Sequence, residues 1–211
     1  MKIIPVVAGL LETNCYLVVN PQSRTSLLFD APPESFDKVF ETLKNEGAEL
    51  EAILLTHSHW DHCADLSIFK EKVSVPVYVH ILDSYRLENP MEHTIIPLDF
   101  EIKACKPDYL IKDEEILQFK TADVRILHTP GHTEGSVVYV VDSLKAAFAG
   151  DTIFYLSVGR TDLPGGDSEQ LKESLYRLLN ELPDDYKLFV GHYQETTVGF
   201  EKSFNPFLVS I

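Results

Sequence analysis

The chain has few cysteines, few basic residues and no long apolar run. Its three cysteines, Cys15, Cys63 and Cys105, are odd in number and form no C-x-x-C pair, so we expect reduced thiols rather than a disulfide framework. Only 18 lysines and arginines face 33 aspartates and glutamates, which gives a formal net charge of -15. A surface of this sign repels phosphate backbones and anionic lipids, so we expect no nucleic-acid partner and no membrane association.

The sequence also contains no candidate membrane span or targeting segment. No window reaches the roughly 18 consecutive apolar residues of a spanning helix, and the apolar run at 3–7 is too short for a signal peptide. We therefore expect a cytoplasmic protein. The length of 211 residues and the hydrophobic content of 45% suit a sizeable core, and without a linker or repeat we expect one domain over residues 1–211.

Apolar patterning predicts two similar halves, each with strands, a helix and a short buried strand that leads to a histidine. The first half contains a meander at 1–29, helices at 33–46, 61–72 and 81–87, strands at 52–56 and 77–79, and a proline-rich loop or lid at 88–107. The second half contains strands at 116–119, 124–128, 136–141, 146–149 and 188–190 and a helix at 168–182, with Ser168 as its N-cap. This order predicts two sheets packed together with helices outside.

Three of the eight histidines lie together, directly after the buried strand at 52–56. His57, His59 and His62 form, with Asp61, an H-x-H-x-D-H motif. The carboxyl ends of strands are where open α/β sheets place their ligands. Four ligand-type side chains at such a position indicate a metal site, and their number suits two adjacent metals better than one.

Three further candidates lie just past other short apolar strands. Two catalytic metals need about six protein ligands, with a bridging carboxylate counted for both. His132, Asp151 and His192 can supply the remainder. Each follows a glycine, and glycine allows tight turns and close backbone approach at a crowded centre. These glycines are Gly131, Gly150 and Gly191.

In their order along the chain, these motifs resemble those of the metallo-β-lactamase superfamily of binuclear hydrolases. The resemblance covers nearly the whole chain, and the phrases at 150–154, 157–167 and 205–208 are similar to compact bacterial glyoxalase II-like thioesterases. It implies an α/β fold with four αββα layers, in which two mixed β-sheets carry helices on their outer faces. It also implies two divalent metal ions, zinc first, although these ligands accept iron or manganese as well.

The resemblance further implies a role for each candidate ligand. His57, His59 and His132 would hold one metal, Asp61, His62 and His192 would hold the second, and Asp151 would bridge them. Asp61 and Asp151 are then the expected catalytic carboxylates. A hydroxide held between the metals would attack the carbonyl of S-2-hydroxyacylglutathione or a similar thioester, so no side-chain nucleophile is required.

Several neighbours of these ligands have two interpretations. Asp30 either supports a ligand histidine or forms a turn, and Arg160 either pairs with Asp162 or meets a substrate carboxylate. Tyr193 stands where the family usually has a glycine, and the stretch 63–65 stands where it usually has a pair of glycines. Both differences are expected to reshape the pocket wall. We expect Arg160 and Tyr193 to be candidates for substrate binding.

Four other residues have mainly structural interpretations. We expect Trp60 to pack beneath the metal loop. His128 either supports the site or packs in its strand, and His80 and His93 are expected to be ordinary surface or loop residues.

Other interpretations of the whole set remain open. The candidates can be ordinary histidines, a structural metal site or a non-catalytic binding module. A lactonase uses the same ligands, and a persulfide dioxygenase needs only a single iron. A β-lactamase would normally have cysteine in place of Asp151 and a secretion signal. Larger glyoxalase II enzymes contact glutathione through a C-terminal domain, and little chain follows His192, so we do not expect that recognition to be inherited.

Overall fold

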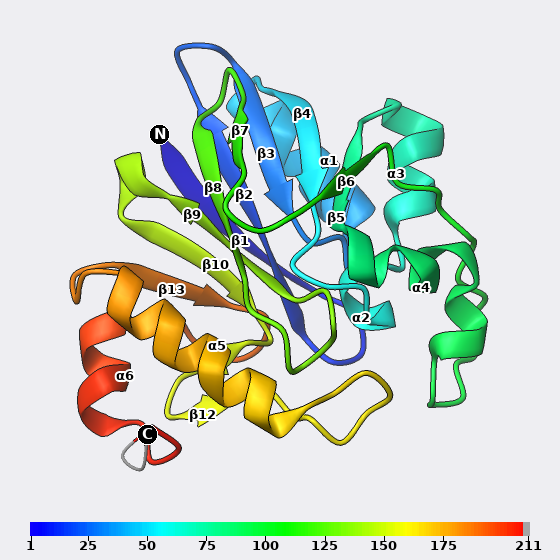
Figure 1. The fold of residues 1–211 in the computed structure, drawn as a ribbon. Helices are drawn as coiled ribbons and strands as arrows, with labels where there is room; N and C mark the ends of the chain where they lie inside the picture. The colour runs from blue at the N-terminus through cyan, green and yellow to red at the C-terminus, as the bar shows by residue number, and fades with distance from the viewer. Residues whose placement is uncertain (209–211) are drawn as a thin grey trace.

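The computed structural model describes residues 1–208, which form two six-stranded β-sheets packed face to face (Figure 1). The first sheet has the order β1-β2-β3-β4-β5-β6, and the second has the order β14-β13-β10-β9-β8-β7. The strands of the first sheet are β1 (Lys2–Ala8), β2 (Thr13–Asn20), β3 (Thr25–Phe29), β4 (Glu49–Leu54), β5 (Val77–His80) and β6 (Tyr109–Ile111). Those of the second are β7 (Ile116–Gln118), β8 (Asp123–His128), β9 (Val137–Val141), β10 (Ala146–Gly150), β13 (Lys187–Val190) and β14 (Thr196–Thr197). A separate hairpin pairs β11 (Ile153–Phe154) with β12 (Ser157–Val158).

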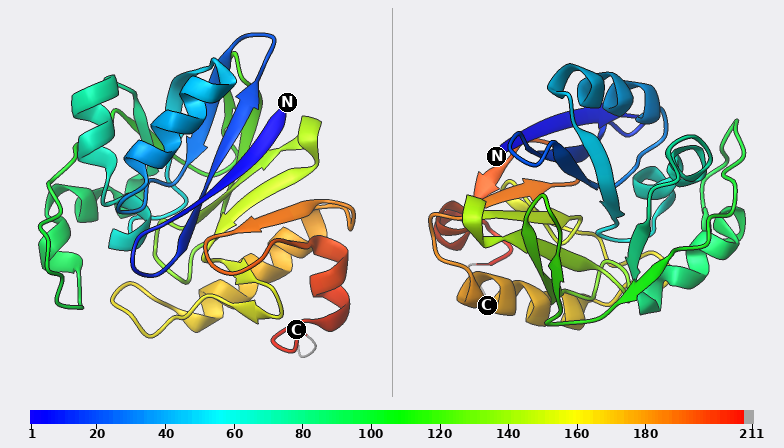
Figure 2. Two further views of the ribbon diagram at one scale, coloured as in Figure 1. Left: turned by 180° about the vertical axis from the view of Figure 1, so that it is seen from behind. Right: turned by 90° about the horizontal axis from the view of Figure 1, so that it is seen from above.

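Helices cover the outer face of each sheet, and Figure 2 shows them as the outer layers on the two sides of the paired sheets. The α-helices are α1 (Phe36–Glu46), α2 (Trp60–Cys63), α3 (Leu66–Val73), α4 (Ser84–Glu88), α5 (Ser168–Glu181) and α6 (Val198–Phe204). The 3-10 turns are η1 (Ile81–Asp83), η2 (Pro90–His93) and η3 (Asp142–Leu144). The predicted αββα sandwich of two mixed sheets is therefore confirmed.

Three apolar cores explain the four layers. Val39 of α1 and Phe69 of α3 pack on the outer face of the first sheet, and Leu175 of α5 packs on the outer face of the second. Between the sheets, the rings of Phe29 and Phe148 stack with centroids 3.8 Å apart. Because the central strands are covered on both faces, they are apolar without alternation.

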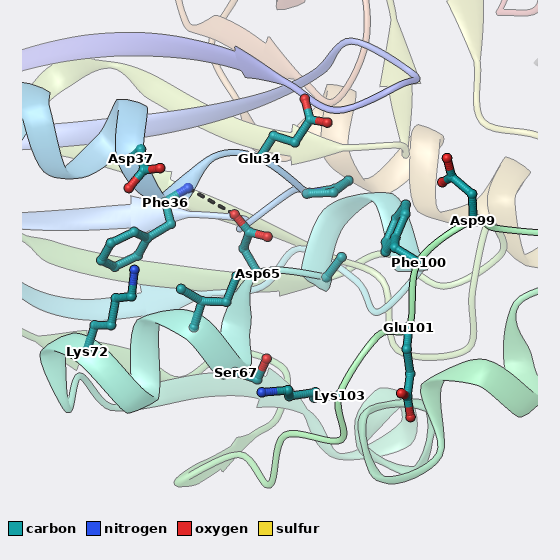
Figure 3. Close-up of a pocket in the computed structure, with 13 residues that line it drawn as sticks. Glu34, Phe36, Asp37, Asp65, Ser67, Lys72, Asp99, Phe100, Glu101 and Lys103 are labelled. Carbon is teal, nitrogen blue, oxygen red and sulfur yellow. Dashed lines mark hydrogen bonds between the residues drawn. The ribbon is translucent and has the colours of Figure 1, made fainter.

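The predicted helix over 61–72 is wrong, because the chain forms two short helices, α2 and α3, with a break between them. The His62 carbonyl accepts a hydrogen bond from the Ala31 amide, which ties the chain to the segment after β3. The Asp65 carboxylate accepts from the backbone amides of Ser35 and Phe36, both at 2.9 Å, and so caps the start of α1 (Figure 3). Tertiary bonds therefore replace the helical ones at this position.

The second half follows the predicted elements closely, with one correction at its long helix. Asp167 rather than Ser168 caps α5, because its side chain accepts from the amides of Glu169 and Gln170. Residues 88–107, predicted to be a loop or lid, contain the last residue of α4 and the turn η2 and otherwise no regular structure. Within residues 1–208, no helix has both the length and the apolar character needed to cross a bilayer.

Strand direction brings several chain segments to one edge of the sandwich. Antiparallel pairing of β8 with β9 and of β9 with β10, and parallel pairing of β10 with β13, make β8, β10 and β13 run the same way. The Thr56 carbonyl, just past β4, accepts from the amide of Val137 at the start of β9. The carboxyl ends of β4, β8, β10 and β13 consequently meet at this edge.

Candidate metal centre

All seven side chains singled out in the sequence come together at this edge. Ligand atoms of three overlapping groups lie within 4.8 Å of one another, namely His57 with His59 and His132, His57 with His62 and Asp151, and Asp61 with His62 and His192. Each follows one of the four strands that end here. Motifs that are far apart in the chain therefore form one cluster in space.

Asp151 lies at the centre of the cluster, and its two carboxylate oxygens face different histidines. Its Oδ1 atom lies 3.2 Å from Nε2 of His62, and its Oδ2 atom lies 3.5 Å from Nε2 of His132 and 3.5 Å from Nε2 of His192. Asp61 Oδ2 lies 3.2 Å from Nε2 of His192. A carboxylate placed in this way can contact two ions at once.

Four of the histidines are held by a hydrogen bond at Nδ1, which leaves Nε2 pointing into the cluster. His62 Nδ1 lies 2.9 Å from Asp30 Oδ2, and His132 Nδ1 donates to the Arg160 carbonyl at 2.8 Å. The other two pairs are His57 Nδ1 with Thr56 Oγ1 at 3.2 Å and His192 Nδ1 with the Leu11 carbonyl at 3.3 Å. Outer hydrogen bonds of this kind fix ring orientation in metal sites.

The expected support of a ligand histidine by Asp30 is present. Besides His62, the Asp30 carboxylate accepts from the amide and the hydroxyl of Thr56, both at 2.8 Å. Asp30 itself has a φ of 64°, in the left-handed region that Asp adopts more readily than most residues. The turn and the support of the histidine are thus the same feature.

Two of the glycines beside the ligands are required by close packing. A Cβ atom on Gly191 would lie 2.2 Å from Asp151 Oδ1 and 2.6 Å from Cε1 of His62. A Cβ atom on Gly131, whose φ is 133°, would lie 2.3 Å from the backbone nitrogen of Leu171 in α5. The predicted close approach is confirmed, since a larger residue at 191 would displace the cluster and one at 131 would displace α5.

Ionisation favours the ligand-competent form at His57, His59 and Asp151, whereas at two other histidines the Asp151 and Asp61 carboxylates outweigh burial and raise the pKa of His62 well above its usual range and the pKa of His192 to about 9. Burial, together with nearby His62, holds the pKa of His57 well below its usual range, and burial beside His132 lowers the pKa of His59 to about 3. Burial alone would raise the pKa of Asp151, but His62 and the other surrounding histidines keep it well below its usual range. Neutral imidazoles and an ionised carboxylate are the forms that bind metals.

The donor set fits divalent ions. Within residues 1–208, three buried side-chain atoms have no hydrogen-bond partner, and they are His57 Nε2, His62 Nε2 and Asp151 Oδ1. All three belong to the cluster, and buried polar atoms normally have a partner. Histidine nitrogens and carboxylate oxygens in this number suit zinc, iron or manganese. The assignment of individual ligands to individual ions stays a prediction.

A cavity of about 690 Å³ opens over the cluster. Its floor includes His59, Asp61 and Asp151, and its wall includes Arg160 and Tyr193, the two candidates for substrate contact. Arg160 forms a bidentate pair with Asp162, with both N–O distances 2.7 Å, so the predicted salt bridge is present.

Tyr193 has its side chain 78% exposed at the cavity mouth. Its φ is 67°, in the left-handed region, and its carbonyl accepts from Asn14 Nδ2 at 2.9 Å. This hydrogen bond holds a backbone conformation that glycine would adopt with less strain.

Trp60 is buried and packs against Ala64 and Ile102, as expected, and it also lines the cavity. The stretch 63–65 does not reshape the cavity wall as we expected. Ala64 and Asp65 instead line a second hollow of about 680 Å³, between α1, α3 and residues 99–103 (Figure 3).

Of the other histidines, His128 follows the packing alternative and His80 differs from expectation. His128 contacts no candidate ligand, because its Nε2 donates to the Glu134 carbonyl and its ring stacks on His80 with centroids 4.1 Å apart. His80 was expected at the surface but is 4% exposed. His93 is exposed, as expected, and lines the cavity. The three cysteines are free thiols, in agreement with the expectation, and all three are buried.

Asp83, which no sequence motif singled out, is fully buried and joins two ligand-bearing loops. Its Oδ2 atom accepts from the Ser58 amide at 2.8 Å and from Thr133 Oγ1 at 3.0 Å, and its Oδ1 atom accepts from the Gly135 amide at 2.8 Å and from Arg86 at 2.9 Å. The sequence feature that could have indicated Asp83 is a carboxylate that follows soon after an apolar strand, as Asp30 does.

Thr13 was not singled out by a sequence motif either. Its hydroxyl donates to Asp61 Oδ2 at 3.2 Å. It lies at the start of β2, far from Asp61 in the chain, and a lone threonine carries no signal in the sequence.

Comparison with known proteins identifies the family of this chain. The metallo-beta-lactamase superfamily matches residues 8–192. A Haemophilus influenzae protein named hydroxyacylglutathione hydrolase GloC is 33% identical over 213 residues, which span 100% of this chain and 98% of the relative. The crystal structure of BLEG-1 B3 metallo-beta-lactamase has a TM-score of 0.91 at 34% identity and covers 98% of this chain and 99% of its own. The crystal structure of TTHA1623 in a di-iron-bound form has a TM-score of 0.83 at 34% identity, and the match covers 97% of this chain and 100% of that chain. The chain therefore belongs to the metallo-beta-lactamase superfamily.

Proposed function

We propose that this protein is a binuclear metal-dependent hydrolase that cleaves a thioester, with S-2-hydroxyacylglutathione or a similar acyl thioester as substrate. The observation that carries the proposal is the position of Asp151, whose two oxygens face His62 on one side and His132 and His192 on the other. The name of the Haemophilus relative supports thioester chemistry. The departures at 63–65 lie away from the cavity, which leaves the reacting centre unaltered.

In this proposal, His57, His59 and His132 hold one divalent ion, and Asp61, His62 and His192 hold the other, with Asp151 shared. Zinc is the proposed metal, and iron is the first alternative because the TTHA1623 structure is described as di-iron-bound. When bound, two such ions supply an activated water at neutral pH and polarise the carbonyl that it attacks.

The chain's own residues prepare this chemistry. The Nδ1 hydrogen bonds of four histidines hold their inward nitrogens at set positions, so little reorganisation is needed during the reaction. Asp151 and Asp61 stay ionised at neutral pH, because neighbouring histidines outweigh the effect of burial and lower the pKa of each carboxyl. Apolar side chains of the cavity wall, among them Leu11 and Phe154, limit the access of bulk water.

Elemental analysis with a thiol-release assay tests the proposal. We expect about two metal ions per chain and release of free thiol from S-lactoylglutathione or a simpler thioester. Asp151→Ala should lose at least one ion and nearly all turnover, because the shared carboxylate is removed. The matched control is Asp123→Ala, an exposed carboxylate at the opposite end of β8 from His132. Two ions and near-normal turnover in Asp151→Ala would refute the ligand assignment.

A second candidate reaction is the opening of a β-lactam ring, favoured by the 34% identity and the fold shared with BLEG-1 B3 metallo-beta-lactamase. Lactonase activity uses the same ligands, and a persulfide dioxygenase shares the fold. A panel of thioesters, lactones and β-lactams, with oxygen uptake on glutathione persulfide, separates these reactions. Turnover confined to a β-lactam or a lactone, or one iron per chain with oxygen uptake, would replace the thioesterase proposal.

A further inference from the structure

We infer that the cavity selects thioesters whose thiol portion is uncharged and apolar, so that a neutral thiol carrier is preferred to the anionic glutathione. The inference rests on the proposed function and narrows it, because among the acyl thioesters proposed there it favours those of a neutral thiol over those of glutathione. It follows from the residues of the cavity wall rather than from those of the metal cluster.

The wall of the cavity is mainly apolar. Leu11 approaches from the β1–β2 turn, Ile95 and Ile96 from the segment after η2, and Phe154 from β11. Leu11 is 46% exposed and Ile95 is 58% exposed, although both are large hydrophobic residues. Large apolar side chains that stay exposed around a cavity mark a surface that an apolar ligand covers. The other apolar lining residues are Trp60, Val158, Leu163 and Pro164.

The first permanent cation in the wall, Arg86, is already neutralised. Its side chain is 4% exposed, and it forms ion pairs with Asp83 and Glu134 and donates to the Pro164 carbonyl. A guanidinium with these partners has few donors left for a ligand carboxylate. Arg86 therefore stabilises the wall and does not attract an anion.

The second permanent cation, Arg160, is exposed, but Asp162 occupies its planar fork from two residues away. A ligand carboxylate would have to displace this partner and would then lie beside its charge. Within residues 1–208 no lysine lines the cavity, and Glu92 adds a further carboxylate to the wall. The net charge of -15 extends the same sign over the whole molecule.

Glutathione carries a carboxylate at each end and is a net anion, so its conjugates need free cations at the cavity wall. This wall offers paired arginines, a free carboxylate and apolar surface. The positive charge of bound metal ions would act at the reacting carbonyl, below the wall that contacts the thiol carrier. A neutral carrier with an alkyl or amide chain matches this wall better, because it buries apolar surface without leaving a charge unpaired.

Trp60 allows ligand binding to be measured directly, because it is the single tryptophan of the chain and lines the cavity. The probes are two thioethers that cannot be hydrolysed, S-hexylglutathione and S-hexyl-N-acetylcysteamine, titrated into the metal-loaded protein while Trp60 fluorescence is recorded. We expect the neutral probe to bind about tenfold more tightly. Added salt should narrow the difference, because it screens the repulsion of the anionic probe. Equal or tighter binding of S-hexylglutathione, or no response to either probe, would overturn the inference.

Two variants test the origin of the preference. Asp162→Asn frees the guanidinium of Arg160, and Glu92→Gln removes a wall carboxylate, so each should tighten S-hexylglutathione binding about threefold and leave the neutral probe unchanged. Glu88→Gln removes an exposed carboxylate outside the cavity and is the matched control. If Glu88→Gln acts as strongly as the other two, general charge repulsion is responsible and the assignment to the wall is wrong.

The two proposals fail separately. If no thioester is hydrolysed while the neutral probe still binds more tightly, the proposed reaction is wrong, but the inferred preference of the cavity for neutral ligands is supported. If S-lactoylglutathione is hydrolysed with a higher kcat/KM than the lactoyl thioester of N-acetylcysteamine, the reaction stands and the inferred preference is wrong.

Discussion

Replacing Asp83 by asparagine tests how the two ligand-bearing loops are held together. The Asp83 side chain is fully buried and accepts hydrogen bonds on both oxygens, from Ser58 and Thr133 on one and from Gly135 and Arg86 on the other. Asparagine has the same shape, but its amide nitrogen cannot accept a hydrogen bond. Whichever way it is oriented, its amide nitrogen faces at least one fixed N–H donor, from Ser58 on one side or from Gly135 and Arg86 on the other.

The expected loss of stability in Asp83→Asn follows from these contacts. Hydrogen bonds to a charged group contribute about 1.5 to 3 kcal/mol each, and breaking a buried ion pair by removing one partner costs about 3 to 5 kcal/mol. Asp83→Asn also leaves the buried Arg86 with Glu134 as its one remaining carboxylate partner among the described residues. We expect the free energy of unfolding, measured in urea, to fall by about 3 to 5 kcal/mol.

Metal content gives a second measurement on the same variant. Ser58 lies between His57 and His59, so movement of its loop should also weaken metal binding. The control is Glu195→Gln, which removes an exposed partner of Lys187 and should change the free energy of unfolding by less than about 1 kcal/mol. A decrease below about 1 kcal/mol in Asp83→Asn, with unchanged metal content, would refute the argument.

Three further predictions address other contacts. Asp30→Asn should lower metal affinity about 10- to 100-fold, because it disturbs the contact with Nδ1 of His62; unchanged affinity in a chelator competition would contradict this. Gly191→Ala should lose metal binding through the clash of its Cβ with Asp151, and two tightly bound ions in elemental analysis would show that the backbone can yield. Burial and the stacked His128 ring lower the pKa of His80 to about 4. The unfolded state then binds this proton more tightly, so the contribution of His80 to stability is complete above about pH 6.5 and is lost as pH falls toward 4. In urea, the free energy of unfolding of His80→Gln should decrease less between pH 6.5 and 4 than that of the unmodified protein. Identical pH profiles for the two proteins would show that His80 is not the cause of the decrease.

Much of the fold could be predicted because its local signals agree with its tertiary structure. The helix before Gly47 and the buried strand before His57 could be predicted from the spacing of their apolar residues. The glycine marked the end of the helix, and in the structure it has a φ of 63°. The helix predicted over 61–72 was wrong because bonds from Ala31 and to the start of α1 interrupt it, and these partners lie far away in the chain. His80 was misjudged for a similar reason, since the ring that covers it belongs to the other sheet.

The amino-acid sequence alone determined which side chains can bind metal, that each follows a short apolar strand, and that glycine stands beside three of them. These properties depend on residue type and short-range spacing, which are readable without a fold. Only the tertiary structure decided that Asp151 lies within 3.5 Å of histidines from both proposed ligand groups, that Thr13 and Asp83 hold the ligand loops, and that carboxylates neutralise both arginines of the cavity wall. Most of these contacts join segments that are remote in the chain, and such segments meet only when the two sheets pack together.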